Sequence, residues 1–301
     1  MKKVLFIILF LGAVASAQPQ TQTQSQPQSQ PAAPPGTDIF LFPLQQGKVA
    51  VADMRNITHH KGYDNQPQFL TNAKQLYYTS IGDDGQAEIF LYDIENSKAK
   101  QITHTPESEF SPTQTPDGKF ISTVRVEKDG TQRLWKFTTD GGEPLIILQN
   151  IKPVGYHAWI NSNTVALYIL GEPSTLQLAE IDTGKSTVIA SNIGRSIHKI
   201  PGKKNLSFVQ KQTETTGTIE EYDPETKQTS TIVKLFPETE DYAWTQQRIL
   251  WTAKDATLYS FRPGKDQNWV REIDLSPSGI KEITIIAISP DERWIAVVST
   301  E

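Results

Sequence analysis

From Thr37 onward, hydrophobic and polar residues alternate in short runs and never settle into helical spacing. Gly, Asp, Asn and Pro separate the runs, and these residues favour turns. Residues 119–137 show the pattern clearly, with two alternating runs joined by Lys128-Asp129-Gly130. This pattern predicts antiparallel strands joined by tight turns, and therefore an all-β fold.

The same two-run unit recurs along the chain, at residues 74–94, 119–137, 163–181, 204–223 and 248–261. A short apolar or aromatic run precedes each unit, and a turn and a further run follow it. The preceding runs align at Pro67, Pro112, His157, His198, Tyr242 and Ile286, which gives intervals of 45, 45, 41, 44 and 44 residues. A period of about 40–45 residues with four strands per unit is typical of β-propeller blades.

The length of the repeating region predicts six blades, because residues 38–301 divide into six units of 44 residues. The last unit, ITIIAISPDERWIAVVSTE, supplies two strands only. Residues 38–44 and 48–54, joined by Gln45-Gln46-Gly47, supply two more. We therefore expect a six-bladed β-propeller with four antiparallel strands per blade, whose ring closes when the N-terminal strands complete the C-terminal blade.

The stretches FSPTQTPDGKFIST (110–123) and IAISPDERWIAVVS (286–299) contain the turn chemistry that joins the first two strands of such a blade. Both resemble the Ser-Pro-Asp-Gly-Lys core of the WD40-like repeat of TolB-type propellers. ITHTPESEF (102–110) and ITHHKGYDNQPQF (57–69) resemble the loop that precedes that core. The resemblance covers residues 38–301 and implies a propeller that binds an envelope partner. TolB-type proteins carry an α/β domain before the propeller, where this chain has a glutamine-rich segment.

The first 36 residues differ in composition from the rest. Lys2 and Lys3, an apolar run over 4–14 and Ala15-Ser16-Ala17 together predict a signal peptide over residues 1–17. Residues 18–36, rich in Gln and Pro and free of charge, predict a disordered tether. The folded domain is expected over residues 37–301.

Charge and cysteine content narrow the class of partner. The sequence has no cysteine and a formal charge of −5, which becomes −7 when the two lysines of the leader are removed. An acidic chain argues against nucleic acid and against anionic membrane surfaces. We expect an exported protein, in the bacterial periplasm or secreted, monomeric and with no transmembrane segment in its mature part.

The loops that lead into the first strand of each unit hold all five histidines and many other polar residues. In a propeller these loops gather around one mouth of the central channel, so they define the candidate binding residues. The set consists of His59, His60, Tyr63, Asp64, His104, Glu107, Glu109, Tyr156, His157, Arg195, His198, Asp241 and Tyr242.

The sequence favours a non-catalytic binding protein for a protein or peptide, and it predicts no catalytic residue and no cofactor. It has no cysteine and no Gly-x-Ser-x-Gly nucleophile elbow. One alternative is a calcium- or zinc-dependent lactonase or esterase that uses the channel. His157 and His198 with Glu109 or Asp241 are the candidate ligands for that reading. The other alternative is saccharide binding by channel aromatics such as Tyr63, Tyr156 and Tyr242. Trp159, Trp244 and Trp294 are expected to pack between blades instead.

Overall fold

The computed structural model describes residues 34–300, and this part of the chain is built from β-strands with no α-helix. The predicted signal peptide and residues 18–33 of the predicted tether lie outside the described residues. Neither of the two short 3-10 helices of residues 34–300 is long and apolar enough to cross a membrane.

Four of the sheets are four-stranded and antiparallel, and each is made from consecutive strands, as the repeat predicts. The first contains β8 (Ser108–Gln114), β9 (Phe120–Val126), β10 (Gln132–Thr138) and β11 (Leu145–Ile146). The second contains β12 (Val154–Asn161), β13 (Thr164–Ile169), β14 (Thr175–Glu180) and β15 (Ser186–Ser191). The third contains β16 (Ile193–Lys199), β17 (Leu206–Lys211), β18 (Gly217–Asp223) and β19 (Gln228–Lys234). The fourth contains β20 (Tyr242–Trp244), β21 (Leu250–Lys254), β22 (Thr257–Phe261) and β23 (Val270–Asp274).

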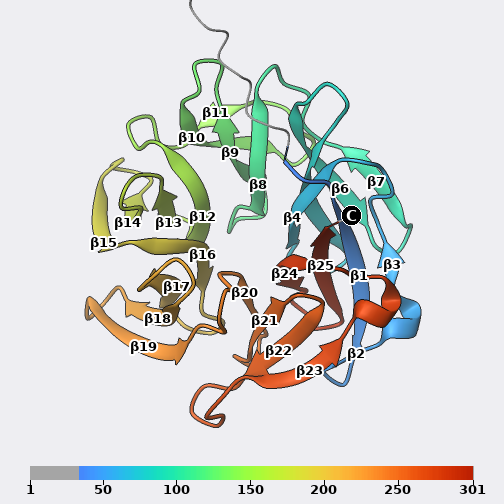
Figure 1. Cartoon of the computed structure of the whole chain (residues 1–301). Coiled ribbons are helices and arrows are strands. Elements are labelled where there is room, and N and C mark those ends of the chain that lie inside the picture. Colours follow the sequence, from blue (N-terminus) through green and yellow to red (C-terminus); the bar gives the residue numbers. More distant parts are fainter. Residues whose placement is uncertain (1–33, 301) are drawn as a thin grey trace, which may run out of the picture. The chain divides into compact units, whose positions relative to one another are not determined.

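The remaining strands form one larger sheet in which the two ends of the described chain meet. It contains β1 (Thr37–Gln45), β2 (Lys48–Val49), β3 (Arg55–Asn56), β4 (Tyr63–Phe69), β5 (Gln75–Ile81), β6 (Ala87–Asp93), β7 (Lys98–Gln101), β24 (Ile283–Ile288) and β25 (Trp294–Thr300). β1 pairs antiparallel with β25 from Thr37↔Thr300 to Pro43↔Trp294, so the two strands lie side by side (Figure 1). A single parallel pair, Thr37↔Tyr63, joins β1 to β4.

Residues 48–54 were expected to form one strand, and this prediction was wrong in its detail. The segment is divided into β2, a 3-10 helix at Val51–Asp53 and β3 beyond it. Val51 and Met54 both pack against the same apolar cluster. Residues three apart lie on one face of a 3-10 helix but on opposite faces of a strand, so burial of both favours the helical turn.

We call β4, β8, β12, β16, β20 and β24 the inner strands, because they lie towards the centre of Figure 1. Each inner strand contacts the next in this order, and β24 contacts β4. The apolar clusters lie between consecutive sheets. One of them, for example, joins Val124 and Leu134 of one sheet to Val165 and Leu167 of the next. Burial of these faces is the main stabilising term of the fold.

Hydrogen bonds between side chains also connect consecutive sheets. Trp244 Nε1 donates to Ser207 Oγ over 2.8 Å, and Tyr242 Oη donates to the same oxygen over 2.9 Å. Tyr242 and Trp244 belong to β20, whereas Ser207 lies on β17 of the preceding sheet and is fully buried. Trp159 of β12 donates in the same way to Ser122 Oγ of β9, over 2.8 Å. Trp159 and Trp244 thus contribute to the contact between sheets, as the sequence predicted, whereas Trp294 packs against an apolar cluster within the large sheet.

Ser207→Ala removes the acceptor of two donors and leaves both unpaired in a buried site. We expect it to lower the free energy of unfolding by about 1–3 kcal/mol, measured by urea denaturation. Ser230→Ala is the matched control, because Ser230 is exposed on β19. Equal stability of the two variants would contradict a stabilising role for these bonds.

Candidate functional site

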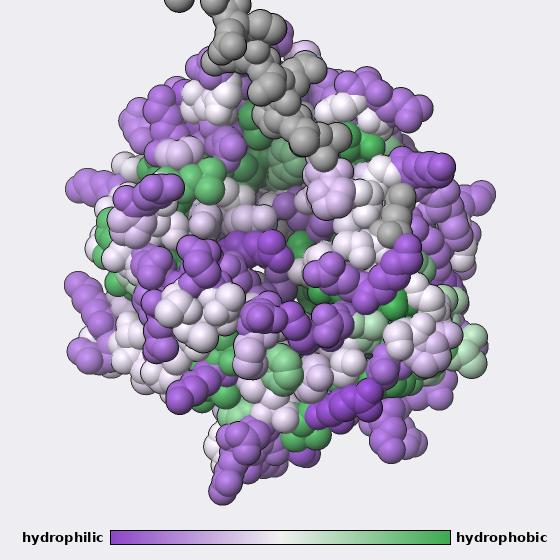
Figure 2. All heavy atoms as spheres, viewed as in Figure 1, coloured by the Kyte–Doolittle hydropathy of each residue, from purple (hydrophilic) through white to green (hydrophobic). Residues whose placement is uncertain are grey.

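A cavity of about 500 Å³ lies along the inner strands, and every inner strand contributes to its wall. The wall extends from Arg195 and Asp241 to Pro116, Pro201 and Pro290, which follow the ends of three inner strands. In Figure 2 the centre of the visible face is hollowed and bordered mainly by hydrophilic residues.

Most of the cavity wall is apolar or carries uncharged amides and hydroxyls. Ile285, Ile286, Ala287 and Ile288 form the wall on β24, and glutamines stand on other strands. The charged side chains of the wall are Arg195, Lys199 and Asp241. A wall of this kind suits a ligand that buries apolar surface and makes a few directed polar contacts.

Arg195 and Asp241 form an ion pair between β16 and the loop before β20. Arg195 Nε donates to Asp241 Oδ2 over 2.8 Å, and Arg195 Nη2 contacts the same oxygen and the Thr284 carbonyl. Ser196 Oγ donates to Asp241 Oδ1 over 3.2 Å. Burial raises the pKa of Asp241, and the Arg195 charge opposes that rise. The pair is a fixed polar point at one end of an otherwise weakly charged cavity.

Two tyrosines stand next to this ion pair. Burial raises the pKa of Tyr63 and of Tyr156, and both phenols interact with Arg195 and Asp241. Gln66 holds the neighbouring strand in place, since its Oε1 accepts from the Ser111 backbone N–H over 2.7 Å. Gln66 and Ser111 have φ angles of 57° and 52°, and each precedes a proline at a β-bulge. The bulges re-aim the side chains of β4 and β8.

His157 lines the cavity, but its ring is hydrogen-bonded to a residue of the neighbouring sheet. Its Nε2 lies 2.7 Å from Ser122 Oγ, which accepts from Trp159 and donates to the Thr113 carbonyl. Nε2 therefore carries the proton and donates to Ser122. Burial lowers the pKa of His157 to about 3, so the ring is neutral at pH 7. Its Nδ1 has no hydrogen-bond partner.

His198 also lines the cavity, and its ring lies 4.7 Å from that of Tyr242. Burial lowers the pKa of His198 to about 4. No group of three or more His, Cys, Asp or Glu side chains within residues 34–300 is arranged to hold a metal ion. The ligand set suggested for the metal-dependent alternative, which pairs these histidines with Glu109 or Asp241, is therefore not assembled.

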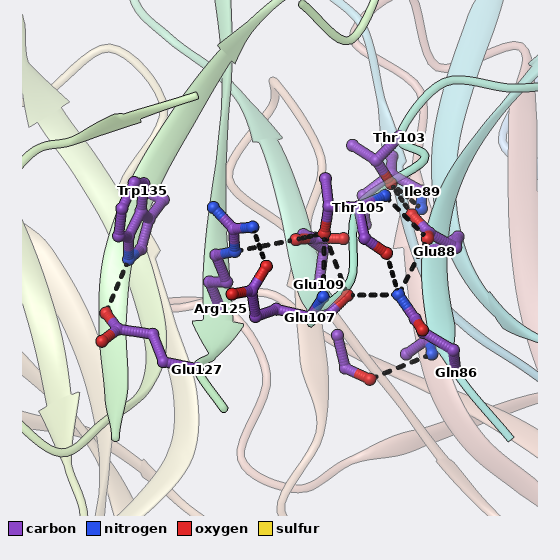
Figure 3. A network of polar contacts seen from close by, with 12 residues as sticks. Gln86, Glu88, Ile89, Thr103, Thr105, Glu107, Glu109, Arg125, Glu127 and Trp135 are labelled. Carbon is purple, nitrogen blue, oxygen red and sulfur yellow. Dashed lines mark hydrogen bonds and ion pairs between the residues drawn. The ribbon is translucent and has the colours of Figure 1, made fainter. Parts of the chain in front are cut away.

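The other residues of the predicted set lie away from the main cavity. Glu107 and Glu109 form a separate polar network with Arg125 (Figure 3). Asp64 is fully buried, with His60 Nε2 at 3.3 Å from its Oδ1. His59 and His104 are exposed. The structure thus brings Tyr156, His157, Arg195, His198 and Asp241 together on one cavity wall, with Tyr63 beside the ion pair, and places the remaining members elsewhere.

Several residues of this region were not in the predicted set: Gln66, Glu88, Ser111, Ser122, Arg125 and Ser207. The repeat offered a signal for two of them. Gln66 and Ser111 stand 45 residues apart, each one position before an aligned proline. Ser122 and Ser207 lie on β9 and β17, the second strands of their sheets. The only sequence signal for them is a small polar residue within an apolar run.

No protein-family model matches the sequence, and no curated protein matches it. Solved structures do match. A protein assigned as TolB from Agrobacterium tumefaciens is 14% identical with a TM-score of 0.68, over 89% of this chain and 99% of that chain. A chain of a nidogen/laminin complex is 13% identical with a TM-score of 0.62, over 84% and 98%. An oligogalacturonate lyase from Vibrio parahaemolyticus is 13% identical with a TM-score of 0.52, over 78% and 88%. The resemblance inferred from the repeat motifs is confirmed at the level of fold, which is that of a TolB-like β-propeller.

The low pKa of His157 predicts loss of stability in acid. The unfolded chain binds a proton at His157 below about pH 6.5, whereas the folded chain does so only near pH 3. Stability contributed by the neutral ring is therefore present above pH 6.5 and lost as the pH falls towards 3, by about 3 kcal/mol at pH 4. We expect His157→Gln to reduce this loss in urea titrations at pH 7 and pH 4. His104→Gln, at an exposed site, should behave like the wild type, and identical acid sensitivity of all three proteins would contradict the assignment.

Proposed function

We propose that this protein is an exported, non-catalytic binding propeller that recognises a protein or peptide segment in the cavity between its inner strands. The observation that carries the proposal is the cavity itself. Every inner strand contributes to it, its wall is mostly apolar and amide-bearing, and its charges are few. An extended segment buries apolar side chains and presents backbone amides, and both find counterparts on this wall.

The proposal includes six blades and a closed ring. The four separate sheets are four blades, and the larger sheet divides at the single Thr37↔Tyr63 pair into two more. One of these consists of β4–β7, and the other of β24, β25 and β1 with β2 and β3. The seven-pair register between β1 and β25 supports closure by the N-terminal strand, as does the contact of β24 with β4. We propose a monomer, because in a closed ring every blade packs against two neighbours and the strand edges that remain are short.

Binding without catalysis agrees with how the polar side chains are used. His157 and Tyr242 bond to serines of neighbouring sheets, and Arg195 and Asp241 bond to each other. None of these groups is left as an exposed, activated nucleophile or base. The likeness to TolB proteins and to a chain of a nidogen/laminin complex supports a protein as the ligand.

A second candidate is action on, or binding of, an acidic saccharide. Two oligogalacturonate lyases share the fold, and one of them is described in complex with manganese. Arg195 and Lys199 on the cavity wall are the cations that an acidic sugar would meet. We rank this candidate second, because residues 34–300 lack an assembled metal-ligand group.

Export is proposed from the leader over residues 1–17, with residues 18–36 as a tether to a domain over 37–301. The bacterial periplasm is the first expected location, since TolB proteins share the fold. The partner is then an envelope protein or peptide.

A tryptophan at position 287 tests the cavity directly. Ala287 lines it on β24, so Ala287→Trp fills the space and should reduce ligand capture at least tenfold without lowering the melting temperature by more than a few degrees. Capture is measured by photo-crosslinking from position 246, an exposed site at the cavity, in envelope extract, with competition by the purified ligand.

Val188→Ser is the matched control, because Val188 is 57% exposed on β15. A crosslinked product that forms equally with Ala287→Trp would contradict binding in the cavity. Turnover of lactones, esters or oligogalacturonate by the wild type, lost in Ala287→Trp, would favour the second candidate.

Expression in a bacterium with a functional export system tests the leader. We expect the product in the periplasmic or secreted fraction to begin at Gln18, because Ala15-Ser16-Ala17 is a cleavage site. Ala17→Arg should leave uncleaved precursor, whereas Ala33→Arg in the tether should not. N-terminal sequencing of both variants decides, and a fully retained product that begins at Met1 would overturn the proposal.

A further inference from the structure

Two buried carboxyl groups occupy equivalent positions 45 residues apart, and neither belongs to the cavity described above. Asp64 lies on β4 and Glu109 on β8, and both side chains are fully buried. Both oxygens of Asp64 and Oε2 of Glu109 lack a hydrogen-bond partner. A buried carboxylate without donors is strongly disfavoured, so the groups that face each one decide its state.

Glu109 faces Glu88, which lies on β6 of the preceding sheet. Glu88 is held from behind: the Ile89 backbone N–H donates to Thr103 Oγ1 over 2.8 Å, and that hydroxyl donates to Glu88 Oε2 over 2.5 Å. Thr105 contributes its backbone N–H to Glu88 Oε1 over 3.2 Å. Glu88 is thus fixed in place opposite Glu109 (Figure 3).

Asp38 of β1 is held in the same way as Glu88, and its charge acts on Asp64. The Ile39 backbone N–H donates to Thr58 Oγ1 over 3.1 Å, and Thr58 Oγ1 donates to Asp38 Oδ1 over 2.9 Å. Asn56 Nδ2 donates to the second oxygen of Asp38. An Ile N–H, a Thr hydroxyl and a carboxyl are therefore linked in the same way on β6 and on β1.

Near Glu109 the carboxyl groups outnumber the positively charged groups. Arg125 Nε lies 3.2 Å from Glu109 Oε1, but its Nη2 is bonded to Glu107. One guanidinium is thus shared by the carboxyls of Glu107 and Glu109. Thr105 Oγ1 donates to Glu109 Oε1 over 2.7 Å and adds no charge.

Near Asp64 the one basic group in contact is His60, whose Nε2 also lies 2.9 Å from Ser80 Oγ. The Tyr78 phenol is affected by the Asp64 charge as well, and its pKa is raised mainly by burial. Burial raises the pKa of Asp64, Asp38 raises it further, and His60 and Ser80 oppose the rise.

Thr105 joins the two carboxyl groups, because its backbone N–H donates to Glu88 Oε1 and its hydroxyl donates to Glu109 Oε1. Two carboxyls can share a hydrogen bond only if one of them holds a proton. Burial raises the pKa of Glu109 to about 8, and Glu88 adds to that rise. The protonated form is therefore the main form of the Glu88–Glu109 pair at neutral pH.

We propose that Glu88–Glu109 is a proton-binding clasp, which holds two neighbouring sheets together through one proton between two carboxyls. Loss of the proton leaves two facing anions and weakens the junction between β6 and β8.

The sign of the effect follows from the raised pKa of Glu109. The folded state binds a proton that the unfolded state has released above about pH 4.5. The stabilisation by the shared proton is complete below that pH and is lost as the pH rises through about 8. The melting temperature of the full chain should therefore fall between about pH 6 and pH 9.

Glu109→Gln supplies a permanent donor to Glu88 and cannot ionise. We expect the variant to melt above the wild type at about pH 9 and to lose at least about half of the slope of melting temperature against pH. Glu220→Gln is the matched control, because Glu220 is 8% exposed on β18 and accepts a bond from Thr231. It removes a carboxyl away from the clasp, so it should keep the wild-type slope.

Infrared spectroscopy reads the shared proton directly and does not depend on stability. We expect the C=O stretching band of a protonated carboxyl at pH 7 in the wild type and in Glu220→Gln, and a weaker band in Glu109→Gln. A wild-type spectrum without the band, or equal slopes for Glu109→Gln and Glu220→Gln, would overturn the proposal.

Discussion

Polar side chains that are buried between consecutive sheets must form hydrogen bonds with the neighbouring sheet. The rest of the structure depends on this constraint. The apolar clusters make burial between sheets favourable, but they also remove water from any hydroxyl, imidazole or carboxyl enclosed there. Ser122 and Ser207 meet the constraint by accepting indole N–H groups from the next sheet. Thr103 meets it by linking a backbone N–H to a carboxylate. These bonds fix how one sheet is set against the next, which non-directional apolar contact does not do.

The same constraint limits the chemistry of the cavity. His157 and Tyr242 on the inner strands are hydrogen-bonded to the neighbouring sheet. Most of the side chains left for a ligand are amides and apolar groups, together with Lys199 and the Arg195–Asp241 pair. A surface of that composition is better suited to binding than to proton transfer or metal chemistry. The proposal of a binding protein therefore rests on how the polar side chains beside the cavity are used.

Local turn chemistry explains why the repeat could be predicted from the sequence. Asp-Gly and Pro-containing turns depend on only a few neighbouring residues. The period of about 45 residues and the positions of the inner strands could therefore be predicted without tertiary information. The direction of each side chain could not be predicted in this way. Bulges at residues 65–68 and 110–113 shift the alternation of inner and outer faces within β4 and β8, and a shift of one residue reverses the face. The register is also shifted within β12 and β16, so the alternation could not predict that Tyr156 and Arg195 line the cavity while Asp64 and Glu109 are buried away from it. Residues 48–54 illustrate a second limit, since burial of Val51 and Met54 overrides the strand pattern.

Buried histidines and buried carboxyl groups limit the stability of the propeller at opposite ends of the pH range. His157 and His198 are kept neutral, so the folded state resists proton uptake and is disfavoured in acid. Asp64 and Glu109 lie beside other carboxyls, so the folded state retains protons and is disfavoured as the pH rises. The histidines act at the inner strands next to the cavity, whereas the carboxyls act at the junctions near β1, β4 and β8. Acid and alkali should therefore loosen different parts of the molecule.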